Sequence, residues 1–212
     1  MIDVVAQVNA VRRQVGARTL EAGEARVVTA TQTYDAPVED VWDACTTADR
    51  LARWFTPVTG ELKPGGRYEL HGNASGTVTA CDPPRSFDAT WEFGGEVSWI
   101  EVRLTAEGPE RTRLTLDHIA HVDDERWAQF GPGAVGLGWD LSLMGLAMHL
   151  TAPDAAIDPA VIEAWSVSEE GRTFVTLAGE DWRRASVAAG TPPEQAEAAA
   201  KNTTEFYSPP SA

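Results

Sequence analysis

The chain has 212 residues, of which 43% are hydrophobic, so it can bury a core without disulfides or structural metals. Its 32 acidic and 17 basic residues give a net charge of −15, which argues against nucleic acid and membrane surfaces as partners. Only Cys45 and Cys81 could form a disulfide, so we expect reduced thiols in a cytoplasmic protein. We expect no secretory signal and no membrane-spanning segment.

The N-terminal third of the chain predicts a helix or arm, then a strand and two short helices. Residues 1–25 are expected to form the helix or arm, because four valines recur there at helical spacing. RVVTATQTY, residues 26–34, is rich in β-branched residues and predicts a strand. Residues 35–55 then predict two helices, the first of them capped by Asp35.

Alternating apolar and polar residues dominate the middle of the chain. In FDATWEF, residues 87–93, every second side chain is apolar, and residues 100–104 and 114–118 repeat this alternation. Short turns rich in glycine and proline separate these segments. The pattern predicts an antiparallel meander with one buried and one solvated face.

A long helix is predicted over residues 137–150, with apolar stripes on two sides that both require a cover. The preceding GPGAVGLG, residues 131–138, lacks the lysine of a phosphate-binding loop and is interpreted as a tight turn into the helix. Cap signals at Asp158, Ser166–Glu169 and Thr191–Glu194 predict further helices. This extension, residues 153–212, would cover the long helix or form a homodimer contact.

The order of these elements resembles the START-like (SRPBCC) superfamily. Several stretches of the sequence are similar to the branch of this superfamily that is named for heat-shock-protein ATPase activators. The matching stretches are YDAPVEDVWDACTTADRLARWF, GELKPGGRYEL, SGTVTACDPPRSFDATWEF, TRLTLDHIAH and GWDLSLMGL. The resemblance implies an α+β helix-grip fold over residues 26–152, in which a curved antiparallel sheet wraps around a long C-terminal helix. Such a sheet often leaves a cavity against the helix. Residues 1–25 and 153–212 lie outside the usual domain.

The alternation and the resemblance point to the same face, and together they give a candidate ligand-binding set. Its members are Trp54, Phe87, Trp91, Phe93, Val102, Leu116, His118, Trp139 and Leu143. The aromatic rings could hold an apolar ligand, or they could fill a close-packed core. Trp54, which precedes a loop, is the candidate for the rim of the pocket.

The polar residues do not form a catalytic set. His118 falls among apolar residues, where it could orient a ligand, act as an acid or base, or be a satisfied core histidine. His121 would point to the opposite face of a continuing strand, so the two histidines could bind one ion only if the strand ends between them, and we expect no metal. No nucleophile elbow or paired carboxylates occur, and no cofactor is expected.

Two functions remain open. The first is binding of a small, mostly apolar molecule, by a carrier, a sensor or a weakly specialised enzyme of the cyclase or dehydratase type. The alternative, implied by the resemblance, is a co-chaperone-like protein that stimulates a chaperone ATPase. A solid interior would favour the second.

Overall fold

The structure is a computed structural model that describes residues 3–155 and 158–208. It separates into two compact units. The first contains Met1–Ala30, His121–Leu141 and Ile157–Ala212, and the second contains Thr31–Ala120 and Ser142–Ala156. Strand β2 (Gly23–Tyr34) and helix α5 (Gly133–Thr151) each contribute residues to both units.

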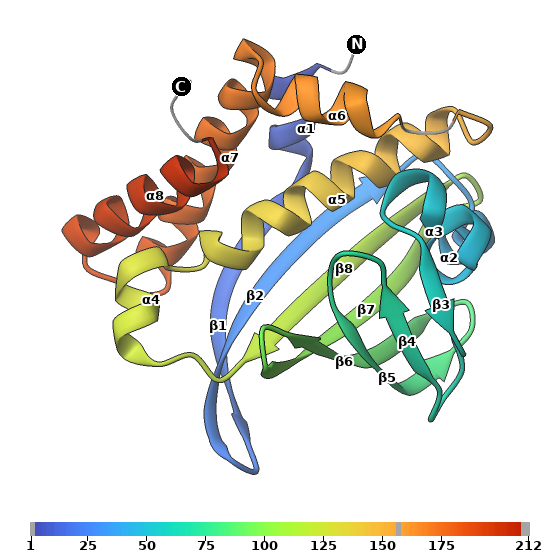
Figure 1. Ribbon diagram of the computed structural model, residues 1–212, viewed down its shortest axis with the longest axis horizontal. Coiled ribbons are helices and arrows are strands. Elements are labelled where there is room, and N and C mark those ends of the chain that lie inside the picture. The colour runs from blue at the N-terminus through green and yellow to red at the C-terminus, as the bar shows by residue number, and fades with distance from the viewer. Residues whose placement is uncertain (1–2, 156–157, 209–212) are drawn as a thin grey trace. The chain divides into compact units, whose positions relative to one another are not determined.

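The strands within the described residues form one eight-stranded sheet in the order β1-β2-β8-β7-β6-β5-β4-β3. Besides β2 they are β1 (Arg12–Leu20), β3 (Val58–Gly60), β4 (Arg67–Leu70), β5 (Ser75–Asp82), β6 (Ser86–Phe93), β7 (Glu96–Gly108) and β8 (Arg111–Ala120). Each registered pair from β3 to β8 is antiparallel. The predicted meander and α+β class are therefore confirmed, and Figure 1 shows the curvature of the β3–β8 strands.

The second unit packs helices on this curved sheet. Helices α2 (Val38–Thr46) and α3 (Ala48–Trp54) follow β2, as predicted, although Pro37 and not Asp35 occupies the N-cap of α2. The tyrosine hydroxyl of Tyr34 donates to the backbone oxygen of Leu143 at 3.3 Å, which ties β2 to the half of α5 in this unit. Both Val102 and Leu116 lie buried, directly opposite each other on β7 and β8.

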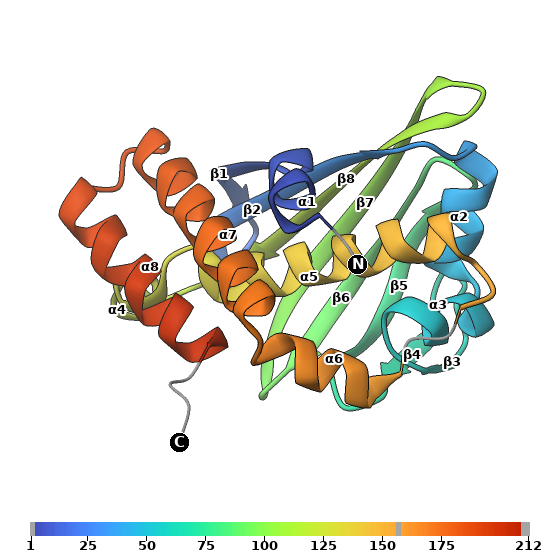
Figure 2. The same cartoon turned by 90° about the horizontal axis from the view of Figure 1, so that it is seen from above.

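The first unit is mainly helical. Its helices are α1 (Val4–Ala10), α4 (Asp124–Phe130), the first part of α5, α6 (Pro159–Ser166), α7 (Glu169–Ala188) and α8 (Pro193–Tyr207). Asp158 caps α6 through its side chain, as predicted. The N-cap of α7 is Ser168, and not Ser166 of the predicted capping box, because Ser166 still belongs to α6. Helix α8 packs along α7 and beside α4, and both views show this (Figures 1 and 2). Among the described helices, none is long and apolar enough to cross a membrane.

Two local expectations for the first unit need correction. Residues 12–20 form strand β1, so the helical valine spacing holds only through α1. Helix α5 begins at Gly133, so most of GPGAVGLG is helical and not a turn. A Cβ on Gly136 would lie 2.3 Å from the buried ring of Trp182, which shows that close packing of α7 requires this glycine.

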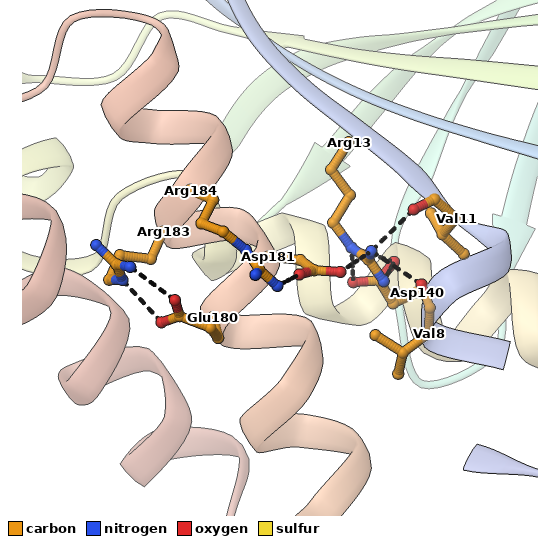
Figure 3. A network of polar contacts seen from close by, with 8 residues as sticks. All are labelled: Val8, Val11, Arg13, Asp140, Glu180, Asp181, Arg183 and Arg184. Atoms are coloured by element: carbon orange, nitrogen blue, oxygen red, sulfur yellow. Dashed lines mark hydrogen bonds and ion pairs between the residues drawn. The ribbon is translucent and has the colours of Figure 1, made fainter. Parts of the chain in front are cut away.

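A buried polar network around Arg13 joins elements of the first unit (Figure 3). The guanidinium of Arg13 on β1 donates to both carboxylate oxygens of Asp140 at 3.1 Å and pairs with Asp181 at 2.8 Å. The indole N–H of Trp182 donates to Asp140 at 2.8 Å. The side chains of Arg13 and Asp140 are both almost fully buried. Their contacts, together with those of Asp181 and Trp182, connect β1 and α7 to α5.

Candidate ligand-binding face

The candidate site is the inner face of strands β6, β7 and β8 in the second unit. Strand register places Phe87 opposite Val102 and Val102 opposite Leu116, so all three side chains share one face. Trp91 and His118 lie on the same face, with their ring centroids 6.3 Å apart. Five of the nine predicted residues are thus brought together by the pleat.

The burial of these side chains is uneven. Val102, Leu116 and His118 are buried, whereas Phe87 and Trp91 keep an intermediate exposure. Leu143, on the part of α5 in this unit, is 3% exposed. The face is therefore a closed apolar floor with aromatic side chains that are only half-buried.

Trp54 has a packing role that the sequence did not reveal. Its indole N–H donates to the backbone oxygen of Ala44 at 3.0 Å. Its own carbonyl oxygen lies 2.6 Å from the point where a Cβ on Gly145 would be. Trp54 therefore packs α3 against both α2 and α5. Its place at the rim of a pocket stays a prediction.

Phe93 has the parity of Phe87 and Trp91 in β6, but it is exposed. Its side chain is 60% exposed, because β6 ends at this residue and the chain turns through Gly94 and Gly95 with positive φ values of 61° and 83°. It borders an open groove of ≈ 680 Å³ that also includes Arg67 and Glu92. Alternation therefore predicts which face Phe93 lies on, but it does not predict burial at the end of the strand.

Trp139 lies in the first unit. It is 9% exposed within α5, as its apolar stripe predicted.

His118 is paired with Ser98, which sequence reasoning did not single out. The imidazole Nε2 lies 2.9 Å from the hydroxyl oxygen of Ser98, and that hydroxyl donates to the backbone oxygen of Trp91 at 3.1 Å. Burial lowers the pKa of His118 to about 4, so the imidazole is neutral near pH 7. Ser98 has the same parity in β7 as Ile100 and Val102, and this alternation was the available signal.

The direction of these hydrogen bonds limits the chemistry of the pair. A carbonyl only accepts, so the single hydroxyl proton of Ser98 is committed to Trp91. His118 therefore donates its Nε2 proton to Ser98 and does not accept a proton from it. A nucleophile–base dyad requires the opposite direction, so the pair has a binding or packing geometry in this structure.

The two cysteines and His121 do not form a second site. Burial raises the pKa of the Cys45 thiol to about 12, and burial followed by the charge of Asp82 raises that of Cys81. Both thiols are free, and neither is activated as a nucleophile. His121 is exposed, with Nδ1 3.0 Å from the backbone oxygen of Glu24. Within residues 3–155 and 158–208, no three His, Cys, Asp or Glu residues are grouped to hold a metal.

The curved sheet and the long helix define the START-like helix-grip class, and comparison with known proteins specifies the family. The model of the family described as "Activator of Hsp90 ATPase homolog 1-like protein" matches residues 35–151. The chain belongs to this family.

Solved structures extend the likeness beyond the family model. The solution structure of CalU16 from Micromonospora echinospora is 34% identical, with a TM-score of 0.68 over 85% of this chain and 97% of CalU16. Its crystal structure is 36% identical, with a TM-score of 0.60 over 80% and 98% of the two chains. Since the CalU16 match exceeds residues 35–151, part of the flanking segments is also shared.

A third structure, DynU16, shares the fold alone. It is described as a protein of the dynemicin biosynthetic locus and is 24% identical, with a TM-score of 0.52 over 60% of this chain and 48% of DynU16. No functionally curated protein matches the sequence significantly.

Proposed function

We propose that the protein binds a small, mostly apolar molecule on the inner face of the sheet in its second unit. The observation that carries this proposal is the half-buried ring of Trp91 on the same face as the buried side chains of Val102 and Leu116. A large aromatic side chain left half-exposed beside Val102 and Leu116 offers contact area that a ligand can bury. A carrier or sensor fits this face better than a cyclase-like or dehydratase-like enzyme. His118 donates a hydrogen bond to Ser98 and does not accept the hydroxyl proton, so it does not act as a base toward Ser98.

Binding should appear as ligand-dependent stability. A molecule such as 2-methoxynaphthalene, at a hundred times its dissociation constant, should add about 2.7 kcal/mol to the free energy of unfolding. The measurement is thermal denaturation of the full chain with and without the probe. Trp91→Ala should reduce this gain, because the variant removes the aromatic contact.

Trp165→Ala is the matched control. Trp165 lies on α6 in the first unit and stacks edge-on with Phe174 at 5.8 Å, away from the proposed binding residues in sequence and unit. The control should keep the full ligand-dependent gain even if its basal stability falls. An equal loss in both variants, or no loss in Trp91→Ala, would contradict the proposal.

A co-chaperone function is the second candidate, and family membership favours it. It would use an exterior surface and would not depend on Trp91. The test is the ATPase rate of an Hsp90-type chaperone with and without this protein. Stimulation that survives Trp91→Ala would favour the co-chaperone, whereas an unchanged ATPase rate together with probe binding would favour the ligand binder.

A further inference from the structure

Among the described residues, Ser98 Oγ makes two hydrogen bonds, and these leave one acceptor position of the oxygen unused. A hydroxyl has one proton and two lone pairs. The proton is donated to the backbone oxygen of Trp91 at 3.1 Å, and one lone pair receives the Nε2 proton of His118 at 2.9 Å. The second lone pair can therefore accept one more hydrogen bond, and Ser98 cannot donate one without breaking its bond to Trp91.

The neighbouring side chain of His118 and the backbone oxygen of Trp91 decide how Ser98 Oγ is oriented. His118 is 6% exposed, so its neutral imidazole is fixed among the buried residues of the face. Ser98 itself keeps an intermediate exposure, as does Trp91 opposite it in the register. The oxygen is thus oriented by a buried neighbour and belongs to a residue that keeps part of its surface exposed.

Two other polar residues on the buried side of the sheet, both on β2, are already engaged. The hydroxyl of Tyr34 donates to the backbone oxygen of Leu143 and is fully buried. Gln32, also on the buried side of β2, has an interaction of its own. Tyr34 is thus committed as a donor, whereas Ser98 Oγ keeps an acceptor position on a group that His118 and Trp91 hold in place.

From this geometry we propose that the ligand carries a hydroxyl or N–H donor that binds Ser98 Oγ while its apolar part lies against Trp91. This inference rests on the proposed function and specifies the chemical class of its ligand. A carboxylate or a ketone in the same place would present a second acceptor to the lone pair of Ser98. Such a ligand would lose its hydration without gaining a hydrogen bond.

Matched probes test the inference on the full chain. The probes 2-naphthol, 2-methoxynaphthalene and 2-naphthoate share one ring system and differ in having a donor, a capped oxygen or a carboxylate. Isothermal titration should give 2-naphthol an affinity about fivefold higher than that of 2-methoxynaphthalene, the size expected for one net hydrogen bond. 2-Naphthoate should bind most weakly.

Ser98→Ala should abolish the advantage of 2-naphthol and leave the affinity for 2-methoxynaphthalene nearly unchanged. Equal affinities in the wild type, or an advantage that survives in Ser98→Ala, would overturn the inference while the proposed function stands. Failure of all three probes to bind would overturn the proposed function, and the inference with it.

A second measurement does not depend on any variant folding. Imidazole ¹⁵N resonances of the unliganded protein report the tautomer of each histidine. The inference requires a proton on Nε2 of His118 and none on Nδ1. A proton on Nδ1 would mean that Ser98 donates to His118, and this result would overturn the assignment of Ser98 as an acceptor.

Discussion

His118 is the residue whose environment most strongly links structure to solution behaviour. Its side chain is 6% exposed, and burial lowers its pKa to about 4 from an ordinary value near 6.5. The unfolded chain therefore binds a proton at this residue at a pH where the folded chain does not. The contribution of His118 to the free energy of unfolding is therefore complete above about pH 6.5, and it is lost as the pH falls toward about 4.

We predict that His118 alone lowers the free energy of unfolding by about 3 kcal/mol between pH 7.5 and pH 4. In His118→Gln, which keeps an N–H donor toward Ser98, the fall should be smaller by about that amount. Urea denaturation of both proteins at the two pH values measures the difference. An identical pH dependence in both would show that His118 is not buried as a neutral group.

Gly136 gives a second prediction for a single residue. An added methyl group would lie 2.3 Å from the ring of Trp182, and overpacking of this kind costs about 1–3 kcal/mol even though alanine favours a helix. Gly136→Ala should therefore lower the melting temperature.

Gly138→Ala is the control for this substitution in the same helix. Its Cβ would lie 3.2 Å from the hydroxyl of Tyr207, which donates to the backbone oxygen of Ala134 at 3.1 Å, so a shift of a few tenths of an ångström suffices and the loss of stability should be smaller than in Gly136→Ala. If the two alanine variants melt alike, Trp182 does not approach α5 this closely.

Secondary-structure elements of the first unit are held by the network around Arg13. The Arg13 guanidinium also donates to the backbone oxygens of Val8 at 3.1 Å and Val11 at 2.9 Å, so it joins the end of α1 to β1. Through Asp140 and Asp181 it reaches α5 and α7, as Figure 3 shows. One side chain thus connects four elements.

We predict that Arg13→Met lowers the free energy of unfolding by about 3–5 kcal/mol, because Asp140 is left buried without its cation. Arg12→Met, an exposed neighbour on the same strand, should change stability by about 0.5 kcal/mol or less. Chemical denaturation compares the two. Adding Asp140→Leu to Arg13→Met should restore part of the loss, and no recovery would mean that the cost lies elsewhere than in the unpaired charge.

For the whole molecule, the periodicity of the sequence predicts most of the apolar packing. Alternation places Phe87, Val102 and Leu116 on one face, and helical stripes bury Trp139 and Leu143. Periodicity does not reveal partners far apart in the chain. Arg13 and Asp140 are separated by 127 positions, and neither residue type signals burial by itself.

Local rules also fail where tertiary packing takes over. The glycines at the start of α5 suggest a turn, yet Gly136 lies inside the helix because Trp182 needs the space. Ser98 is an unremarkable polar residue in sequence, and only the neighbouring strands show that its hydroxyl is bound on two sides. The hydrogen bonds of Ser98 could therefore not be predicted, although the inward positions of His118 and the apolar residues could.

Methyl NMR of the full chain during titration with 2-methoxynaphthalene tests the proposed binding face most directly. The methyl resonances of Val102, Leu116 and Leu143 should shift and saturate together, whereas those of the exposed Val161 and Val167 should stay in place. Saturating shifts at the first three residues alone are the predicted result. Shifts confined to exposed methyls, or no saturation at all, would contradict a ligand site on the inner face of this sheet.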